Sequence, residues 1–343
     1  MSTVLPNREN RCVAGASKIQ PRPPSGTPFA PIQSDLEEVE RLLAETITSR
    51  QSALSPLISH LDHYRGKRLR PALLLLVARA CGRVTLAHHV LGAVVEMIHT
   101  ATLVHDDVLD EAAVRRHAST INAGWGNQTS ILLGDYLFTH AFHLASTVDA
   151  RACRLIGEAT NRVCEGELQQ TIQRGNWRLS EQDYLDIIDG KTAALTSCCA
   201  QLGALYSDAE PDLVQRMARY GRWLGMAFQI ADDLLDLMGE ERVTGKSLGT
   251  DLDQNKPTLP LIYLLGHASA DKGSRLEQIL ASPGNHKRES LRPFLVESGS
   301  LGYASRKAEE FARKAKAELN GLPSSECKSI LELLTDRVVH RSS

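Results

Sequence analysis

The chain has 343 residues, of which 42% are hydrophobic and 23% are charged, and its formal net charge at pH 7 is -2. This length can bury a large core, in one big domain or in two smaller ones. The small net charge excludes general electrostatic attraction to nucleic acid, so any polyanion must be bound by local basic clusters.

The seven cysteines are scattered and show no CxxC spacing. This pattern argues against a disulfide framework or a structural zinc site, and it favours a reducing, cytoplasmic location. The longest aliphatic run, 72–78, is much shorter than the roughly twenty residues that a membrane span requires. We therefore expect no transmembrane segment.

In chain order, residues 1–33 form a Pro-rich leader without an apolar segment, which we expect to be disordered, and residues 34–343 form one domain. After the leader, Gly and Pro become rarer and no long stretch alternates with period two, so the expected fold class is all-α. An apolar stripe predicts a first helix over 35–50, and a second begins at Pro71 and ends near Cys81. Further helices are expected over about 86–110, 128–147, 149–173, 180–206, 211–238, 257–268, 287–298, 301–319 and 325–340.

Two copies of one acidic pattern follow apolar stretches, at 106–110 (DDVLD) and at 232–236 (DDLLD). On a helix, the first and last Asp of each copy lie on the same face. Like charges at this spacing destabilise a helix unless a cation binds between them. Mg2+ prefers one or two carboxylates together with substrate phosphates. A single copy is common on solvated helices, but the repeat predicts two walls of one metal and diphosphate site.

The helix before the first motif carries further polar side chains. At about 100 degrees per residue, His99 and Thr102 fall within roughly 40 degrees of Asp106. A lone histidine on a helix is more often packed or bridged by solvent than functional. Position alone therefore leaves binding and packing open for His99.

Basic residues are placed as a diphosphate site requires. Residues 65–71 (RGKRLRP) form a basic turn before a helix, where free backbone N–H groups also favour an anion. Arg115 and Arg116 follow the first acidic motif, although Arg115 could instead form a surface ion pair with Glu111. Each basic residue alone is more often solvated, but together they could neutralise two diphosphates; the further members of this set are Lys191, Lys246 and Lys256.

These segments together resemble the trans-isoprenyl diphosphate synthases, or polyprenyl synthetases, and most of all their medium- and long-chain members. The matching segments occur in the family's order and span nearly the whole chain after the leader: GKRLRP at 66–71, EMIHTATLVHDDVLD at 96–110, RR at 115–116, GDY at 134–136, GKT at 190–192, FQIADDLLD at 228–236 and TGKSLGTDLDQNKPTLP at 244–260. The resemblance implies the isoprenoid synthase fold, a single all-α domain of about ten core helices around a central cavity. It also implies a homodimer.

The resemblance further implies a role for each matching residue. Three Mg2+ on the allylic diphosphate would be held by one set of carboxylates, Asp106, Asp110 and Asp232, with Asp107, Asp233 and Asp236 as ligands or as partners of the ligands. The same diphosphate would be clamped by Arg115, Lys191, Lys246 and Lys256. Isopentenyl diphosphate would be bound by Lys67, Arg70, His99 and Arg116. The polar pair Thr192 and Gln229 would lie beside the reacting carbon, where oxygen dipoles stabilise an allylic cation.

The implied reaction is a Mg2+-dependent condensation of isopentenyl diphosphate with an allylic diphosphate. Breaking the allylic C–O bond creates a carbocation and a diphosphate anion, so the site must stabilise charge and exclude water. A class I terpene cyclase also uses such a motif, but it needs no second diphosphate subsite. A non-catalytic partner subunit typically loses its Asp motifs, and a generic helical interaction protein leaves the ordered motifs unexplained.

Product length in this family depends on the side chain five positions before the first Asp, here Ala101, and on its neighbour Thr102. Both are small where short-chain enzymes carry aromatic rings, which predicts an all-trans product of about C30 or longer. The alternative is a farnesyl or geranylgeranyl diphosphate synthase, because Phe138 or Phe142 could close the cavity lower down. A long product allows transient contact with a membrane surface during release.

Overall fold

The computed structural model describes residues 29–49, 51–239, 248–282 and 286–339. Most of these residues are helical, which confirms the all-α fold class. Nearly all of the expected leader lies outside the described residues, and so does Lys246. Within the described ranges, no helix is both long enough and apolar enough to cross a membrane.

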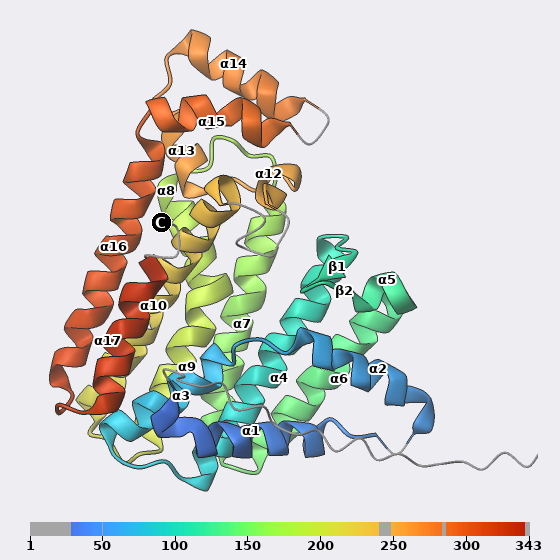
Figure 1. Cartoon of the computed structure of the whole chain (residues 1–343), viewed down its shortest axis with the longest axis vertical. Helices are drawn as coiled ribbons and strands as arrows, with labels where there is room; N and C mark the ends of the chain where they lie inside the picture. The colour runs from blue at the N-terminus through green and yellow to red at the C-terminus, as the bar shows by residue number, and fades with distance from the viewer. Residues whose placement is uncertain (1–28, 50, 240–247, 283–285, 340–343) are drawn as a thin grey trace, which may run out of the picture.

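The N-terminal helices lie together at one end of the molecule, at the bottom of Figure 1. They are α1 (Gln33–Thr46), α2 (Ser55–His60) and α3 (Leu69–Cys81), with the short turns η1 (Ala30–Ile32), η2 (Ser52–Leu54) and η3 (Leu61–Tyr64). The long central helices follow, namely α4 (Leu86–Leu109), α6 (Asn127–Ser146), α7 (Ala150–Ile172), α9 (Ala194–Leu205) and α10 (Pro211–Met238).

Shorter elements connect and cover the central helices. A hairpin of two-residue strands, β1 (Val114–Arg115) and β2 (Ala118–Ser119), and helix α5 (Ile121–Trp125) follow α4, and α8 (Glu181–Ile188) follows α7. The C-terminal part comprises α12 (Thr250–Asp253), α13 (Leu259–Gly266), α14 (Ala270–Ala281), α15 (Lys287–Glu297), α16 (Ser300–Glu318), η5 (Leu319–Gly321) and α17 (Glu326–Val339). In Figure 1, α14 and α15 lie at the end opposite to α1.

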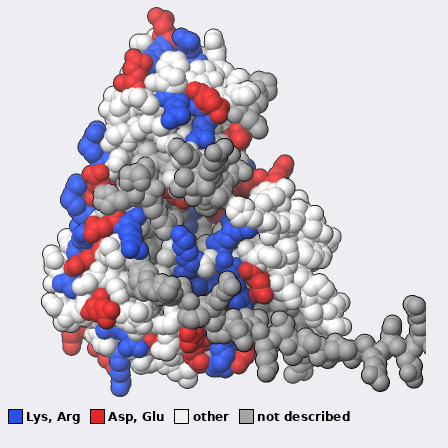
Figure 2. Space-filling view, viewed as in Figure 1, with Lys and Arg blue, Asp and Glu red and all other residues white. Residues whose placement is uncertain are grey.

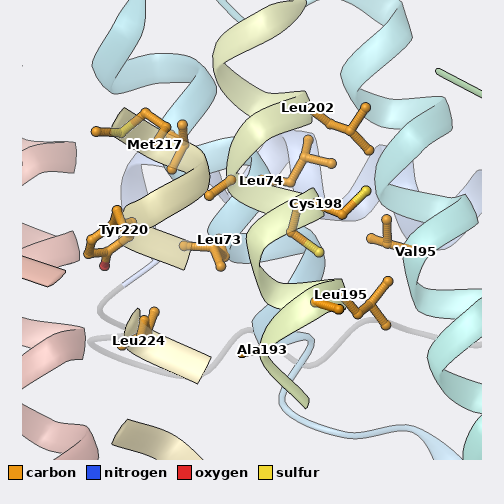
Figure 3. Packing of buried hydrophobic residues seen from close by; sticks show 14 of the residues in the cluster. Leu73, Leu74, Val95, Ala193, Leu195, Cys198, Leu202, Met217, Tyr220 and Leu224 are labelled. Atoms are coloured by element: carbon orange, nitrogen blue, oxygen red, sulfur yellow. The ribbon is translucent and has the colours of Figure 1, made fainter. Parts of the chain in front are cut away.

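The core is centred on α9, which packs against α3, α7 and α10. Figure 3 shows Leu195, Cys198 and Leu202 of α9 among side chains of α3 and α10, such as Leu74 and Met217. All five are at most 3% exposed. Eight of the twelve residues of α9 are buried, so this helix lies inside the molecule rather than at its surface.

Helix α4, which carries the first acidic motif, is bounded by local signals at both ends. Thr85 is its N-cap, and the Thr85 backbone N–H donates to His88 Nδ1 over 2.9 Å. The helix ends at Leu109, and Glu111 has a φ of 50°. This left-handed conformation ends the helix, so Glu111 and Arg115 do not form the helical ion pair that the sequence allows.

The predicted helices differ from the observed ones in several places. The helix expected over 35–50 ends at Thr46, and the helix expected over 180–206 is split by a π-helical turn, η4 (Asp189–Ala193). The sequence did not predict α2, α5, α14 or the β1–β2 hairpin, all of which are short or strongly polar. These elements are held mainly by tertiary contacts, which local periodicity does not report.

Candidate active site

The two acidic motifs lie at the C-terminal ends of α4 and α10, and the segment 250–256 joins them. Asp236 of the second motif accepts hydrogen bonds from the Thr250 hydroxyl (3.0 Å) and the Asp251 backbone N–H (3.1 Å) at the start of α12. Lys256, at the end of the same segment, places Nζ 3.2 Å from Asp110 Oδ1 of the first motif. Motifs that are more than one hundred residues apart in sequence therefore line one region.

Asp106 of the first motif is a partly buried carboxylate. Its side chain accepts no hydrogen bond from any described residue. Burial first, and then the negative charge of Glu167, raise the pKa of Asp106 to about 7, although Lys191 opposes this effect. Asp110, by contrast, is contacted by two cations, Lys256 and Arg174, the latter at 3.0 Å.

The middle carboxylate of each motif points into the protein. Asp107 is 1% exposed, accepts from Tyr64 Oη over 2.6 Å, and binds Nε and Nη2 of Arg115 at 2.8 Å. Asp233 is 5% exposed and accepts from Tyr184 Oη over 2.6 Å. Burial first raises the pKa of Asp233, to about 7. Because their oxygens are engaged inside the protein, Asp107 and Asp233 are poorly placed as metal ligands.

The π-helical turn η4 positions Lys191 and Thr192. Gly166 allows α7 to approach this turn, because a Cβ there would lie 2.4 Å from the Lys191 backbone N. Asp189, the first residue of the turn, accepts from Arg222 Nε over 2.6 Å and from Arg162. The turn is thus fixed by α7 on one side and by α10 on the other.

Lys191 extends from this turn toward the first motif. Its Nζ lies 2.7 Å from Glu167 Oε1 and 2.9 Å from Gln170 Oε1, both on α7. Burial alone would lower the pKa of Lys191, but the charges of Glu167 and Asp106 raise it above its ordinary value. Lys191 therefore keeps its positive charge beside Asp106.

Two arginines of the basic turn at 65–71 are already neutralised. Arg68 Nη1 lies 2.6 Å from Glu96 Oε1, and Arg68 also contacts Glu40. Arg65 Nε lies 3.0 Å from Asp62 Oδ1. These side chains tie the turn to α1 and α4 rather than offering charge to a ligand.

Three other cations near this turn form no ion pair with any carboxylate in the described part of the chain: Lys67, Arg70 and Arg116. Arg70 Nε is buried without a hydrogen-bond partner among the described groups. Burial first, and then the charges of Arg70 and Arg116, hold the pKa of His99 well below its ordinary value. Gly66 makes room for Arg116, because a Cβ there would lie 2.7 Å from Arg116 Nη2. Figure 2 shows Lys and Arg side chains gathered near the middle of the molecule's face.

Ala101, one of the two residues that the family resemblance assigns to product length, lies in a separate apolar cluster. Ala101 is 0% exposed and packs with Val104 of α4 and with Leu133 and Leu137 of α6. The Thr102 hydroxyl donates to the His99 carbonyl over 2.8 Å. Phe138 packs against the same cluster.

Two residues of α7 and one residue of the turn that follows it were missed by the sequence reasoning. Glu167 and Gln170 bind Lys191, and Arg174 binds Asp110. Glu167 and Gln170 are three residues apart and so lie on one face of α7, a signal that the sequence contains, whereas Arg174 lies in the turn beyond the helix end. Tyr64 and Tyr184 were also missed, because no local pattern connects a tyrosine with a carboxylate more than forty residues away.

Among the described residues, no three carboxylate, histidine or cysteine side chains gather closely enough to hold a metal ion by themselves. This arrangement fits Mg2+, which takes one or two carboxylates and completes its shell with water and phosphate oxygens. Asp106 also fits, because it is a carboxylate that lacks a hydrogen-bond donor and lies near further negative charge. Both oxygens of Asp236, by contrast, are engaged by the start of α12.

Known proteins are similar to this chain over most of its length. A family model described as polyprenyl synthetase matches residues 51–296. The octaprenyl diphosphate synthase of Escherichia coli (strain K12) is 35% identical over 320 residues, which cover 90% of this chain and 99% of the relative. The all-trans-nonaprenyl-diphosphate synthase (geranyl-diphosphate specific) of Rhodobacter capsulatus is 35% identical over 315 residues, which cover 91% and 97%.

Solved structures are similar over the same extent. A decaprenyl diphosphate synthase from Rhodobacter capsulatus superimposes with a TM-score of 0.87 at 35% identity and covers 92% of this chain and 98% of its own. A polyprenyl synthase from Caulobacter crescentus CB15, solved in complex with calcium and isoprenyl diphosphate, has a TM-score of 0.87 at 33% identity and covers 94% and 100%.

Proposed function

The chain belongs to the polyprenyl synthetase family, and on this premise we propose that it condenses isopentenyl diphosphate with an allylic diphosphate to make an all-trans polyprenyl diphosphate of medium to long chain. The enzyme is a prenyltransferase of isoprenoid biosynthesis. The relatives named above are octaprenyl, nonaprenyl and decaprenyl diphosphate synthases, which supports the chain length.

One observation carries this proposal: the site has two groups of opposite charge, and part of each group lacks a partner. The acidic group centres on Asp106, whose carboxylate accepts no hydrogen bond from a described residue. The basic group comprises Lys67, Arg70 and Arg116 around His99. A terpene cyclase needs only one diphosphate subsite, whereas a prenyltransferase needs two. The separate basic group therefore favours the prenyltransferase.

The basic group is proposed to bind isopentenyl diphosphate. Arg70 and Arg116 offer guanidinium donors that match phosphate oxygens, and Lys67 adds a point charge. His99 is neutral at pH 7, because its pKa is depressed, and so it contributes a hydrogen bond rather than a charge. Binding at this position would hold the double bond of isopentenyl diphosphate against the allylic carbon.

The acidic group, with its neighbouring lysines, is proposed to bind the allylic diphosphate. Divalent cations held by Asp106, Asp110 and Asp232 would, when bound, neutralise the charge that develops on the departing diphosphate. The Caulobacter crescentus relative, solved with calcium and isoprenyl diphosphate, supports the use of a divalent metal. Mg2+, three ions per site, is the proposed physiological form, and Asp236 would join this set only after leaving α12.

Cationic side chains would hold the same diphosphate from the protein side. Lys191 extends from η4 beside Asp106, and Lys256 lies beside Asp110. Arg115 offers its remaining donor, Nη1, because Asp107 engages only Nε and Nη2. Lys246 is also proposed for this role. As the C–O bond breaks, its electrons leave with the diphosphate, and the double bond of isopentenyl diphosphate supplies the electron pair of the new C–C bond. The released diphosphate would then take the proton that the resulting cation loses.

A second copy of the chain is proposed as the partner. Four large apolar side chains are at least 46% exposed on the consecutive helices α6 and α7: Ile131, Leu132, Leu168 and Ile172. Large apolar side chains left exposed on helices that pack together support a surface covered by a partner. We place the homodimer in the cytoplasm because the scattered cysteines suit a reducing compartment.

The test is to incubate the purified protein and Mg2+ with labelled isopentenyl diphosphate and, separately, with allylic primers from C5 to C20. Sizing of the products should give a polyprenyl diphosphate of about C30 or longer. Main products of C20 or shorter would favour the farnesyl or geranylgeranyl alternative. A cyclic hydrocarbon formed without isopentenyl diphosphate would identify a terpene cyclase instead.

A further inference from the structure

A chain of hydrogen bonds connects Tyr184 to Thr192 through the second acidic motif. Tyr184 Oη donates to Asp233 Oδ2 over 2.6 Å, and Gln229 Nε2 donates to Asp233 Oδ1 over 2.8 Å. Thr192 Oγ1 then donates to Gln229 Oε1 over 2.7 Å. Tyr184, Asp233 and Thr192 are all less than 10% exposed. The chain links α8, α10 and η4.

The direction of each bond follows from the chemistry of the groups. The Gln229 NH2 group lies at Asp233 Oδ1 and the Gln229 amide oxygen lies at Thr192 Oγ1, so both Asp233 oxygens accept, one from Gln229 and one from Tyr184. The Thr192 hydroxyl donates its only proton to the Gln229 amide oxygen. Thr192 Oγ1 and Gln229 Oε1 therefore keep free lone pairs, and neither can donate a proton to a third group.

The same arrangement of tyrosine and middle carboxylate occurs at the first motif. There Tyr64 Oη donates to Asp107 over 2.6 Å, the same distance as between Tyr184 and Asp233. Each of the two middle carboxylates thus has its own buried tyrosine partner, although their other partners differ. This repetition indicates that these middle residues act on neighbouring side chains within the protein.

We propose that Tyr184 and Asp233 are positioning residues, which orient Gln229 so that Gln229 and Thr192 present only acceptor oxygens to the allylic carbon. The proposal rests on the function given above, in which this carbon becomes positive as the diphosphate leaves. Two oriented oxygen dipoles favour that charge, whereas a reversed amide would present N–H groups and oppose it. Because the dipoles are fixed before the reaction, no reorganisation is needed as the charge develops.

Tyr184→Phe removes one end of the chain of bonds and leaves every proposed diphosphate contact in place. We expect its kcat to fall about tenfold, with the KM of both substrates within about twofold of wild type. Solvolysis of a C15 allylic diphosphate without isopentenyl diphosphate should fall by the same factor. In that reaction the C–O bond breaks, the diphosphate leaves with the electron pair, and water supplies the hydroxyl of the alcohol and releases a proton.

Asp233→Asn is the second variant. The new amide can keep the Tyr184 bond through its oxygen, but it presents NH2 to Gln229 and so turns the Gln229 amide around. We expect solvolysis to fall at least as much as in Tyr184→Phe. The side-chain 15N resonance of Gln229, identified by its loss in Gln229→Met, should shift in both variants, and this readout does not depend on turnover.

Tyr220→Phe is the matched control, because Tyr220 is also a fully buried tyrosine, and its hydroxyl bonds the Leu331 carbonyl at 3.0 Å, outside this chain of bonds. It should lower thermal stability, leave kcat within about twofold and leave the Gln229 resonance unchanged.

A wild-type rate of solvolysis in Tyr184→Phe would overturn the proposal, and so would an equal loss of kcat in the control. If Tyr184→Phe does not fold, wild-type solvolysis by Asp233→Asn overturns it. A wild-type protein without prenyl transfer refutes the proposed function, while the Gln229 resonance still tests the orientation.

Discussion

Arg68 and Arg70 are two residues apart, yet their surroundings give them different tasks. Arg68 is held between two carboxylates, those of Glu40 and Glu96. Arg70 has no carboxylate partner among the described residues, and its Nε is buried without a hydrogen bond. An unpaired buried cation destabilises the free protein, so an anion that binds it is favoured strongly.

This difference predicts distinct effects on the two substrates. Arg70→Ala and His99→Ala should raise the KM for isopentenyl diphosphate at least about tenfold more than the KM for the primer. Lys191→Ala should act mainly on the primer, because Lys191 lies beside Asp106. Arg68→Ala, the matched control, should lower the unfolding temperature and change neither KM by more than about twofold. Steady-state kinetics with each substrate varied in turn would show equal effects if the assignment were wrong.

Asp106 and Asp232 are expected to be required for turnover. Asp106→Ala or Asp232→Ala should lower kcat by at least about a hundredfold, the loss typical of one electrostatic stabiliser. The helical circular dichroism spectrum should not change. Asp271→Ala, at an exposed carboxylate of α14, serves as the control. Activity of either site variant within threefold of wild type at saturating Mg2+ would argue against the shared metal site.

At the scale of secondary-structure elements, the two faces of α4 have separate tasks. Asp106 faces the charged region, whereas Ala101 packs in an apolar cluster with α6. At about 100 degrees per residue, these two positions are roughly 140 degrees apart. A change at position 101 therefore need not disturb the groups that drive ionisation.

We expect Ala101→Phe to end elongation early, with main products of about C15 to C20 at a near-normal rate per condensation, because the ring shortens the space for the chain. If position 101 is only a packing site, the ring overpacks the cluster and destabilises the fold by about 1–3 kcal/mol. Product sizing and thermal unfolding separate these results. A less stable protein with the wild-type product distribution would rule out the predicted floor.

The π-helical turn η4 gives an independent prediction about an element. Gly166→Ala places a methyl group against the Lys191 backbone N, where the ideal distance is only 2.4 Å. The turn must shift, so we expect a loss of about 1–3 kcal/mol in stability and a larger primer KM. Gly157→Ala lies on the same helix with nothing within 4 Å of the added atom and serves as the control. Equal kinetics for both variants would show that η4 does not set the position of Lys191.

The sequence predicts the long helices well, because their apolar positions repeat with the helical period. Charge and spacing predict that the two acidic motifs line one site beside basic clusters, whereas the choice of Lys67, Arg70 and Arg116 within those clusters comes from the family resemblance. The sequence does not predict that Asp107 points inward, since this depends on Tyr64, forty-three positions earlier, and on a hairpin. Nor does it predict η4, because a π turn depends on the fit of Gly166 against the Lys191 backbone.

At the scale of the whole molecule, the buried carboxylates link stability to pH. The pKa values of Asp106 and Asp233 are raised to about 7 from an ordinary 3.8. Since the folded pKa is the higher one, each group stabilises the fold fully below about pH 4 and loses this contribution as pH rises through 7. The unfolding temperature of metal-free protein should thus fall by about a few degrees between pH 5.5 and 8. The fall in unfolding temperature should be smaller when Mg2+ and inorganic diphosphate are present. A fall as large as that of the metal-free protein would contradict the linkage.

Both acidic motifs also lie at the C-terminal ends of long helices, α4 and α10. Each helix end adds the equivalent of roughly half a negative charge to the carboxylates already there. A diphosphate that arrives without cations is therefore repelled, and one that arrives as a magnesium complex is attracted. Because of the polarity of these two helices, the fraction of sites that hold a diphosphate substrate depends on the concentration of free Mg2+ as well as on that of the prenyl substrate.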